Sequence, residues 1–85
     1  MESGSVKKRI LFLCTGNACR SQMAEGWARN LKGDVIEPYS AGIHPIGVSS
    51  RAVEVMAEAG VDISGHRSKH LSEFINDEFD YVITL

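Results

Sequence analysis

A short apolar run that leads straight into a polar loop constrains the fold of this chain more than any other feature. Residues 10–14 read Ile-Leu-Phe-Leu-Cys, a continuous apolar segment typical of a strand that is covered on both faces. The loop of residues 15–20 follows, and a helix is predicted from Ser21 to about Lys32. Strand, loop and helix in direct succession indicate a parallel α/β fold, with the loop at the carboxyl end of the first strand.

The rest of the chain continues this alternation of strands and helices. The predicted elements are a strand over 35–41, a helix from Ser49 or Ser50 to about Gly60, a short helix over 71–75 and a continuously apolar strand over 81–85. Pro38 cannot donate to a sheet ladder, so its strand belongs at an edge. Right-handed crossovers then give the strand order 2-1-3 in a flavodoxin-like, three-layer sandwich with a parallel sheet. Ligands in such sheets bind beside the first strand, where Cys14 lies.

Length, charge and cysteine content narrow the possible classes. The 85 residues, 44% of them hydrophobic, predict one small globular domain over 8–85 behind a flexible lead-in over 1–7. The net charge of −2 argues against non-specific nucleic-acid binding, and the apolar run near the start is too short for a signal peptide or membrane span. Both cysteines lie in one loop and form no disulfide framework, which indicates a reducing, cytoplasmic location.

Cys14 has the setting of a nucleophile. Gly16 and Asn17 can adopt the left-handed backbone angles that turn successive N–H groups inward, and the loop closes onto a helix N-terminus that favours negative charge. This helix is amphipathic, with the apolar stripe Ala24, Trp27, Ala28 and Leu31. Such surroundings lower the pKa of a thiol from about 8.5 to about 3.5–7.5. Ser21 can donate a hydrogen bond to the Cys14 sulfur, and capping of the helix is a second role that is compatible with the first.

The loop is predicted to bind a tetrahedral oxyanion such as phosphate, arsenate or sulfate. The binding residues are Thr15, Gly16, Asn17, Ala18, Cys19 and Arg20. The guanidinium of Arg20 offers a planar fork of donors that matches the oxygens of such an anion. Cys14 then attacks the central atom in line with the leaving oxygen, while loop N–H groups stabilise the developing charge. The predicted catalytic residues are therefore Cys14, Arg20 and Ser21.

The run Cys-Thr-Gly-Asn-Ala-Cys-Arg-Ser-Gln-Met-Ala-Glu-Gly-Trp over 14–27 resembles the low-molecular-weight protein tyrosine phosphatase superfamily, and most of all its thioredoxin-coupled arsenate reductases. The stretches 39–43, 61–67 and 79–85 support this resemblance, which runs from about Lys8 onward. It implies a phosphatase I-like fold, of which this chain is the N-terminal portion and which is incomplete on its C-terminal side.

The resemblance implies two alternative chemistries. An arsenate reductase would take electrons from thioredoxin through cysteines that follow Leu85, whereas a phosphatase would hydrolyse phosphomonoesters such as phosphotyrosine through a cysteinyl-phosphate, with a general acid that also follows Leu85. The residue types at Thr15, Gln22 and Gly26-Trp27 resemble those of the reductases more than those of the phosphatases. Because the decisive residues lie outside the chain, a catalytically incomplete oxyanion-binding fragment remains a third alternative.

The resemblance also implies a supporting network and a modified cation site. Asn17, Ser21, Ser40 and His66 match positions of a hydrogen-bond network that steadies the loop. Glu25 and Ser40 match positions at which some reductases hold potassium, but Lys69 stands where those members have a carboxylate. We therefore expect no metal and no cofactor, and we expect the Lys69 ammonium to pair with Glu25 in place of the ion.

Three further expectations concern cysteines, metals and association. Cys14 and Cys19 lie close enough in the loop to form a disulfide under oxidation. A zinc site formed by these cysteines with His66 and His70 is disfavoured, because the gap between the pairs is long and Arg20 would repel the cation. The apolar strand 81–85 is expected to leave an open edge that invites self-association.

Overall fold

The computed structural model describes residues 6–85, so most of the predicted lead-in over 1–7 lies outside the described residues. The elements in chain order are β1 (Lys8–Cys14), α1 (Arg20–Lys32), β2 (Ile36–Gly42), α2 (Ser50–Glu58), the 3-10 helix η2 (Leu71–Phe74) and β3 (Tyr81–Thr84). Each predicted strand and helix is present, with bounds that differ by one or two residues at most ends. No helix among residues 6–85 has the length and apolar character needed to cross a bilayer.

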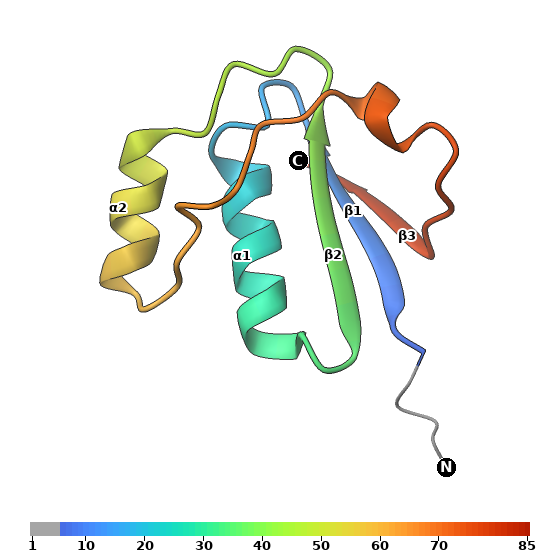
Figure 1. Ribbon diagram of the computed structural model, residues 1–85, viewed down its shortest axis with the longest axis horizontal. Helices are drawn as coiled ribbons and strands as arrows, with labels where there is room; N and C mark the ends of the chain where they lie inside the picture. The colour runs from blue at the N-terminus through green and yellow to red at the C-terminus, as the bar shows by residue number, and fades with distance from the viewer. Residues whose placement is uncertain (1–5) are drawn as a thin grey trace.

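The three strands form one parallel sheet in the order β2-β1-β3 (Figure 1). This order and the predicted edge position of the strand that contains Pro38 are confirmed. Phe12 of β1 lies opposite Ser40 of β2 and Ile83 of β3. The register brings Cys14 opposite Gly42, so the carboxyl ends of β1 and β2 lie side by side.

Two different layers cover the sheet. Helices α1 and α2 lie on one side, and Ser40 reaches the side chain of Glu25 in α1 from that face (Figure 1). Tyr39, the neighbour of Ser40 in β2, points to the opposite face because side chains alternate along a strand. There its ring packs edge-on against Phe74 and Phe79, with centroids 5.6 and 5.4 Å away. The predicted three-layer arrangement is therefore confirmed.

The apolar core lies between α1, α2 and the segment that follows α2. Ala52, Met56, Val61 and Ile63 form its buried cluster. Gly26 of α1 lies directly against this cluster, because a Cβ atom at Gly26 would come within 2.6 Å of the Ile63 Cγ2 atom. The absence of a side chain at position 26 therefore sets how closely residues 61–63 approach α1.

The apolar stripe that predicted α1 is not the face that the helix buries. Its buried residues are Ser21, Gln22, Glu25 and Gly26, whereas 38% of Trp27 and 65% of Leu31 are exposed. The apolar residues of β3 are exposed as well, although a continuous apolar strand was predicted to be covered on both faces. Strand β3 does form an open edge, as expected.

Candidate active site

The predicted oxyanion loop lies at the carboxyl end of β1, where three segments meet. Residues 43–46 run alongside it, and His44 N donates to Thr15 O over 2.8 Å. From the third segment, Ser68 Oγ donates to Gly16 O over 3.1 Å. Gly42 permits this close approach, because a Cβ atom there would lie 2.6 Å from Thr15 O. The loop is therefore held from both sides.

The Cys14 sulfur accepts hydrogen bonds from the loop and from α1. Ser21 Oγ lies 2.9 Å from Sγ, and Asn17 N donates to Sγ over 3.1 Å. Burial alone would raise the pKa of Cys14, but hydrogen bonds from the Ser21 hydroxyl and from the N–H groups of Asn17, Ser21 and Ala18 outweigh it and hold the pKa below its ordinary value. The thiolate is therefore the favoured form of this side chain compared with an ordinary cysteine.

Ser21 bonds to the sulfur and does not cap α1. The N-cap residue of the helix is Cys19, and its side chain makes no capping hydrogen bond. The Ser21 Oγ atom accepts from Asn17 Nδ2 over 2.8 Å, so the hydroxyl hydrogen is free to point at Cys14 Sγ. The capping interpretation of Ser21 is wrong because α1 begins one residue earlier, at Arg20.

Asn17 gives the loop its shape. It is fully buried and has a φ angle of 48°, in the left-handed region. Gly16 was also expected to take such an angle, but Asn17 is the only loop residue among 14–20 with positive φ. The Asn17 Oδ1 atom accepts from Gln22 Nε2 over 2.9 Å and from Lys69 N over 2.8 Å. One side chain thus ties the loop to α1 and to the segment before η2.

Arg20 stands at the mouth of the loop. It is the first residue of α1 and is exposed, as are Thr15 and Cys19. Within residues 6–85, its guanidinium makes no side-chain hydrogen bond or ion pair. Its donors are therefore available to an anion that enters from solvent.

Gln22 joins the loop to His66. Its Nε2 atom also donates to Arg67 O over 3.0 Å, and its Oε1 atom lies 2.9 Å from His66 Nδ1. Because the carboxamide oxygen can only accept, His66 carries its proton on Nδ1. The other ring nitrogen, Nε2, lies 3.2 Å from Arg29 NH1, a donor. Burial lowers the pKa of His66, and this outweighs the opposing charge of Glu25, so the neutral ring is favoured.

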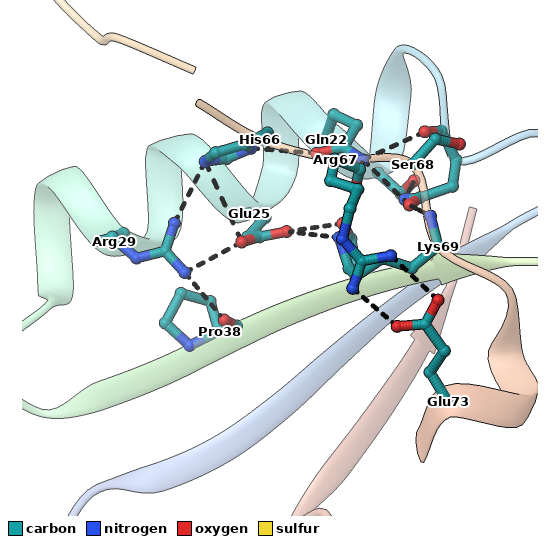
Figure 2. A network of polar contacts seen from close by, with 12 residues as sticks. Gln22, Glu25, Arg29, Pro38, His66, Arg67, Ser68, Lys69 and Glu73 are labelled. Carbon is teal, nitrogen blue, oxygen red and sulfur yellow. Dashed lines mark hydrogen bonds and ion pairs between the residues drawn. The ribbon is translucent and has the colours of Figure 1, made fainter. Parts of the chain in front are cut away.

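A partly buried ion cluster, centred on the buried Glu25, lies behind the loop (Figure 2). Glu25 accepts from Ser40 Oγ over 2.6 Å and from Arg29 NH2 over 2.9 Å, and its Oε1 atom lies 4.0 Å from Lys69 Nζ. The predicted pairing of Lys69 with Glu25 is therefore present. Burial lowers the pKa of Lys69, and the charge of Glu25 opposes this shift. Among the described residues, Ser40 has no direct bond to Asn17 or Ser21; it is linked to them through Glu25, Arg29, His66 and Gln22.

The four residues of the disfavoured zinc site do not gather. His70 caps η2, where its Nδ1 atom accepts from Ser72 N over 3.0 Å, and His66 is engaged with Gln22. No three potential ligands from histidine, cysteine, aspartate and glutamate lie together in the described part of the chain. Cys14 and Cys19 are both free thiols.

Two residues of the network, Gln22 and Arg29, were not among the predicted supporting residues. Together with Glu25 they follow the spacing i, i+3, i+7, so one polar stripe on α1 is as continuous as the apolar one. This spacing was a usable signal that the three side chains act together. The pattern alone does not indicate that the polar stripe faces inward.

Comparisons with known proteins agree with this geometry. The model of the low molecular weight phosphotyrosine protein phosphatase family matches residues 9–85. Arsenate reductase 2 of Staphylococcus haemolyticus is 51% identical over 79 residues, which are 93% of this chain and 60% of that protein. The structure of an arsenate reductase in the phosphate binding state superimposes with a TM-score of 0.86 at 42% identity, over 92% of this chain and 60% of the other.

A phosphatase structure is similar as well. The low molecular weight protein tyrosine phosphatase from T. tengcongensis has a TM-score of 0.76 at 44% identity and covers 92% of this chain. The chain spans about 60% of the length of the curated relatives it matches. Since the family model covers nearly all of its residues, the chain belongs to the low molecular weight phosphotyrosine protein phosphatase family.

Proposed function

We propose that this chain carries the oxyanion-binding and nucleophilic half of an arsenate reductase. The observation that carries the proposal is the Cys14 sulfur, which accepts from Ser21 Oγ and from Asn17 N at the start of α1 and has a lowered pKa. The names of the curated relatives favour arsenate over other oxyanions. Residues 8–85 form the N-terminal portion of the family domain in this proposal.

The anion binds between Arg20 and the N–H groups of the loop. Residues 15–20 surround its oxygens, with the guanidinium of Arg20 as a bidentate donor. The N-terminus of α1 adds partial positive charge. A structural neighbour is an arsenate reductase in the phosphate binding state, which supports the binding of a tetrahedral oxyanion by this chain.

The reaction proceeds in two steps. The thiolate of Cys14 attacks arsenic, an S–As bond forms and one oxygen leaves as water, with arsenic still pentavalent. A second thiolate then attacks the Cys14 sulfur and forms a disulfide, while the S–As electron pair stays on arsenic, which leaves as trivalent arsenite. The family resemblance implies that the second thiol, and another cysteine that relays the disulfide, match positions after Leu85. Thioredoxin, a dithiol, reduces the disulfide, and a reducing cytoplasm suits this cycle.

Phosphomonoester hydrolysis is the second candidate. The likeness to a protein tyrosine phosphatase at 44% identity favours it, because the same loop can bind a phosphate ester. Cys14 would then form a cysteinyl-phosphate that water hydrolyses. Here Asn17, Ser21, Ser40 and His66 have the same supporting role as in the reductase.

Anion protection of Cys14 tests the shared first step. The protein is treated with iodoacetamide at pH 6, and labelled Cys14 is quantified by mass spectrometry with and without arsenate or sulfate. Fast labelling that the anions suppress is expected, and slow labelling that is indifferent to them would overturn the proposal. Arsenate reduction with thioredoxin and hydrolysis of p-nitrophenyl phosphate, each against Cys14→Ser, then separate the reductase, the phosphatase and the fragment that binds without turnover.

A further inference from the structure

We infer that Gln22 is a positioning residue that holds Asn17, and through Asn17 the Cys14 thiolate, in the reactive arrangement. The inference rests on the function proposed above. It concerns a side chain that lies behind the loop and has no hydrogen bond to the sulfur among the described residues.

The side-chain amide nitrogen of Gln22 donates to both the carbonyl and the side-chain oxygen of Asn17. Its Nε2 atom lies 2.9 Å from Asn17 Oδ1 and 3.1 Å from Asn17 O, and both residues are fully buried. Asn17 holds a φ angle of 48°, a left-handed angle that asparagine adopts more readily than most residues with a side chain. The two contacts with Gln22 hold Asn17 in this conformation. The backbone N–H that this conformation aims at Cys14 Sγ therefore depends on Gln22.

The same contact orients the side-chain amide of Asn17. Because Oδ1 accepts from Gln22, Nδ2 must point the other way, where it donates to Ser21 Oγ over 2.8 Å. Ser21 is then left with its hydroxyl hydrogen to donate to the Cys14 sulfur. If the amide of Asn17 were reversed, its oxygen would compete with the sulfur for that hydrogen.

The far end of Gln22 extends the chain of donors to the ion cluster. His66 Nδ1 donates to Gln22 Oε1 over 2.9 Å, and Arg29 NH1 lies 3.2 Å from His66 Nε2. In order, the donors run from Arg29 through His66, Gln22, Asn17 and Ser21 to Cys14. Every hydrogen in this series points toward the sulfur, and hydrogen bonds in series polarise one another. Such a series stabilises the anion more than the thiol.

The test replaces Gln22 by methionine, which keeps the length of the side chain and removes its hydrogen-bonding groups. The rate of Cys14 alkylation by iodoacetamide is measured from pH 5 to 9, with the label located by mass spectrometry. For Gln22→Met we expect a raised pKa of Cys14 and a rate about threefold to tenfold lower at pH 6. The limiting rate at high pH should be unchanged. Asn30→Met, on the exposed surface of the same helix, should keep the wild-type profile.

The outcomes separate this inference from the proposed function. Wild-type protein without low-pH reactivity at Cys14 would remove the proposed function itself. Reactive wild-type protein with an identical profile for Gln22→Met would overturn the role of Gln22 alone.

A measurement on the wild-type protein covers the case in which the variant does not fold. Gln22 is the only glutamine in the chain, so selective 15N labelling gives one side-chain amide signal. We expect slow solvent exchange of this amide and a clear shift when Cys14 is alkylated. The inference would be overturned if this amide exchanged with solvent as fast as a free amide and if its chemical shift did not change on alkylation.

Discussion

On the inner face of α1 the buried side chains are polar, whereas on β3 the side chains that face solvent are apolar. Ser21, Gln22 and Glu25 of α1 are at most 7% exposed, whereas the apolar and aromatic residues 81–83 of β3 are between 41% and 58% exposed. Both regions therefore reverse the usual distribution of residue types.

The difference shows what each region contributes. A buried polar group destabilises the fold unless it finds a partner, and each of the three on α1 has at least one hydrogen bond. Ser21 and Gln22 bond to the loop and to the segment that precedes η2, and Glu25 bonds to Ser40 of β2, so the buried polar face joins α1 to the elements around the loop. The side chains of β3 have little such cover, and the strand is held mainly by its ladder to β1.

The largest effect is expected at the centre of the polar region. Asn17→Ala removes the bonds to Ser21, Gln22 and Lys69 and leaves an unfavourable φ angle, so the free energy of unfolding should fall by about 3 kcal/mol in urea titrations. Asn17→Gly should recover about 1 kcal/mol, because glycine accepts the backbone angle without restoring the bonds. Equal losses in both variants would show that the backbone angle carries no strain.

A smaller effect is expected when one bond to the sulfur is removed. Ser21→Ala should raise the pKa of Cys14 and lower its alkylation rate at pH 6 about tenfold, because the thiolate loses a charge-assisted hydrogen bond. The measurement is the pH profile of labelling. Ser50→Ala, at the exposed start of α2, is the matched control. An unchanged profile for Ser21→Ala would mean that loop N–H groups alone hold the anion.

The pH dependence of stability tests the polar region as a whole. The pKa of His66 is lowered in the folded protein, so the unfolded chain binds the proton first and stability should fall as the pH drops below about 6.5. The lowered pKa values of Asp62 and Glu73 belong to carboxyl groups that titrate at lower pH. The pKa of Cys14 is lowered too and gives a slope of the same sign. Urea titrations between pH 7.5 and 5.5 are therefore made on Cys14→Ser, where the remaining slope should be abolished by His66→Gln. A slope that persists in this variant would assign it to another group.

The smallest effect on stability is expected in the apolar region. Val82→Lys on β3 should change the free energy of unfolding by no more than about 0.5 kcal/mol, since the side chain is already exposed. It should also reduce concentration-dependent association in light scattering, because charge at an edge strand opposes pairing. Val55→Lys, at an exposed position of α2, should leave association unchanged. A large loss of stability in Val82→Lys would contradict the comparison.

The strand order and the position of Cys14 at the carboxyl end of its strand could be predicted because each depends on a local rule. Pro38 assigns its strand to an edge, and the run that ends at Cys14 leads directly into a loop and a helix. The inward face of α1 could not be predicted in this way. Helical periodicity identifies the apolar stripe with Trp27 and Leu31, whereas burial is decided by contacts with residues 61–69, which are distant in sequence.

The close approach of Ile63 to Gly26 makes the surroundings of Cys14 depend on a residue that has no side chain. The segment that follows Ile63 continues to Arg67 and Lys69. The Arg67 carbonyl oxygen accepts a hydrogen bond from Gln22, and the Lys69 N–H donates one to Asn17. A methyl group at position 26 would push residues 61–69 away from α1 and lengthen or break these two hydrogen bonds. The hydrogen-bond network at the N-terminal end of α1 thus depends on the absence of a side chain near the middle of the helix.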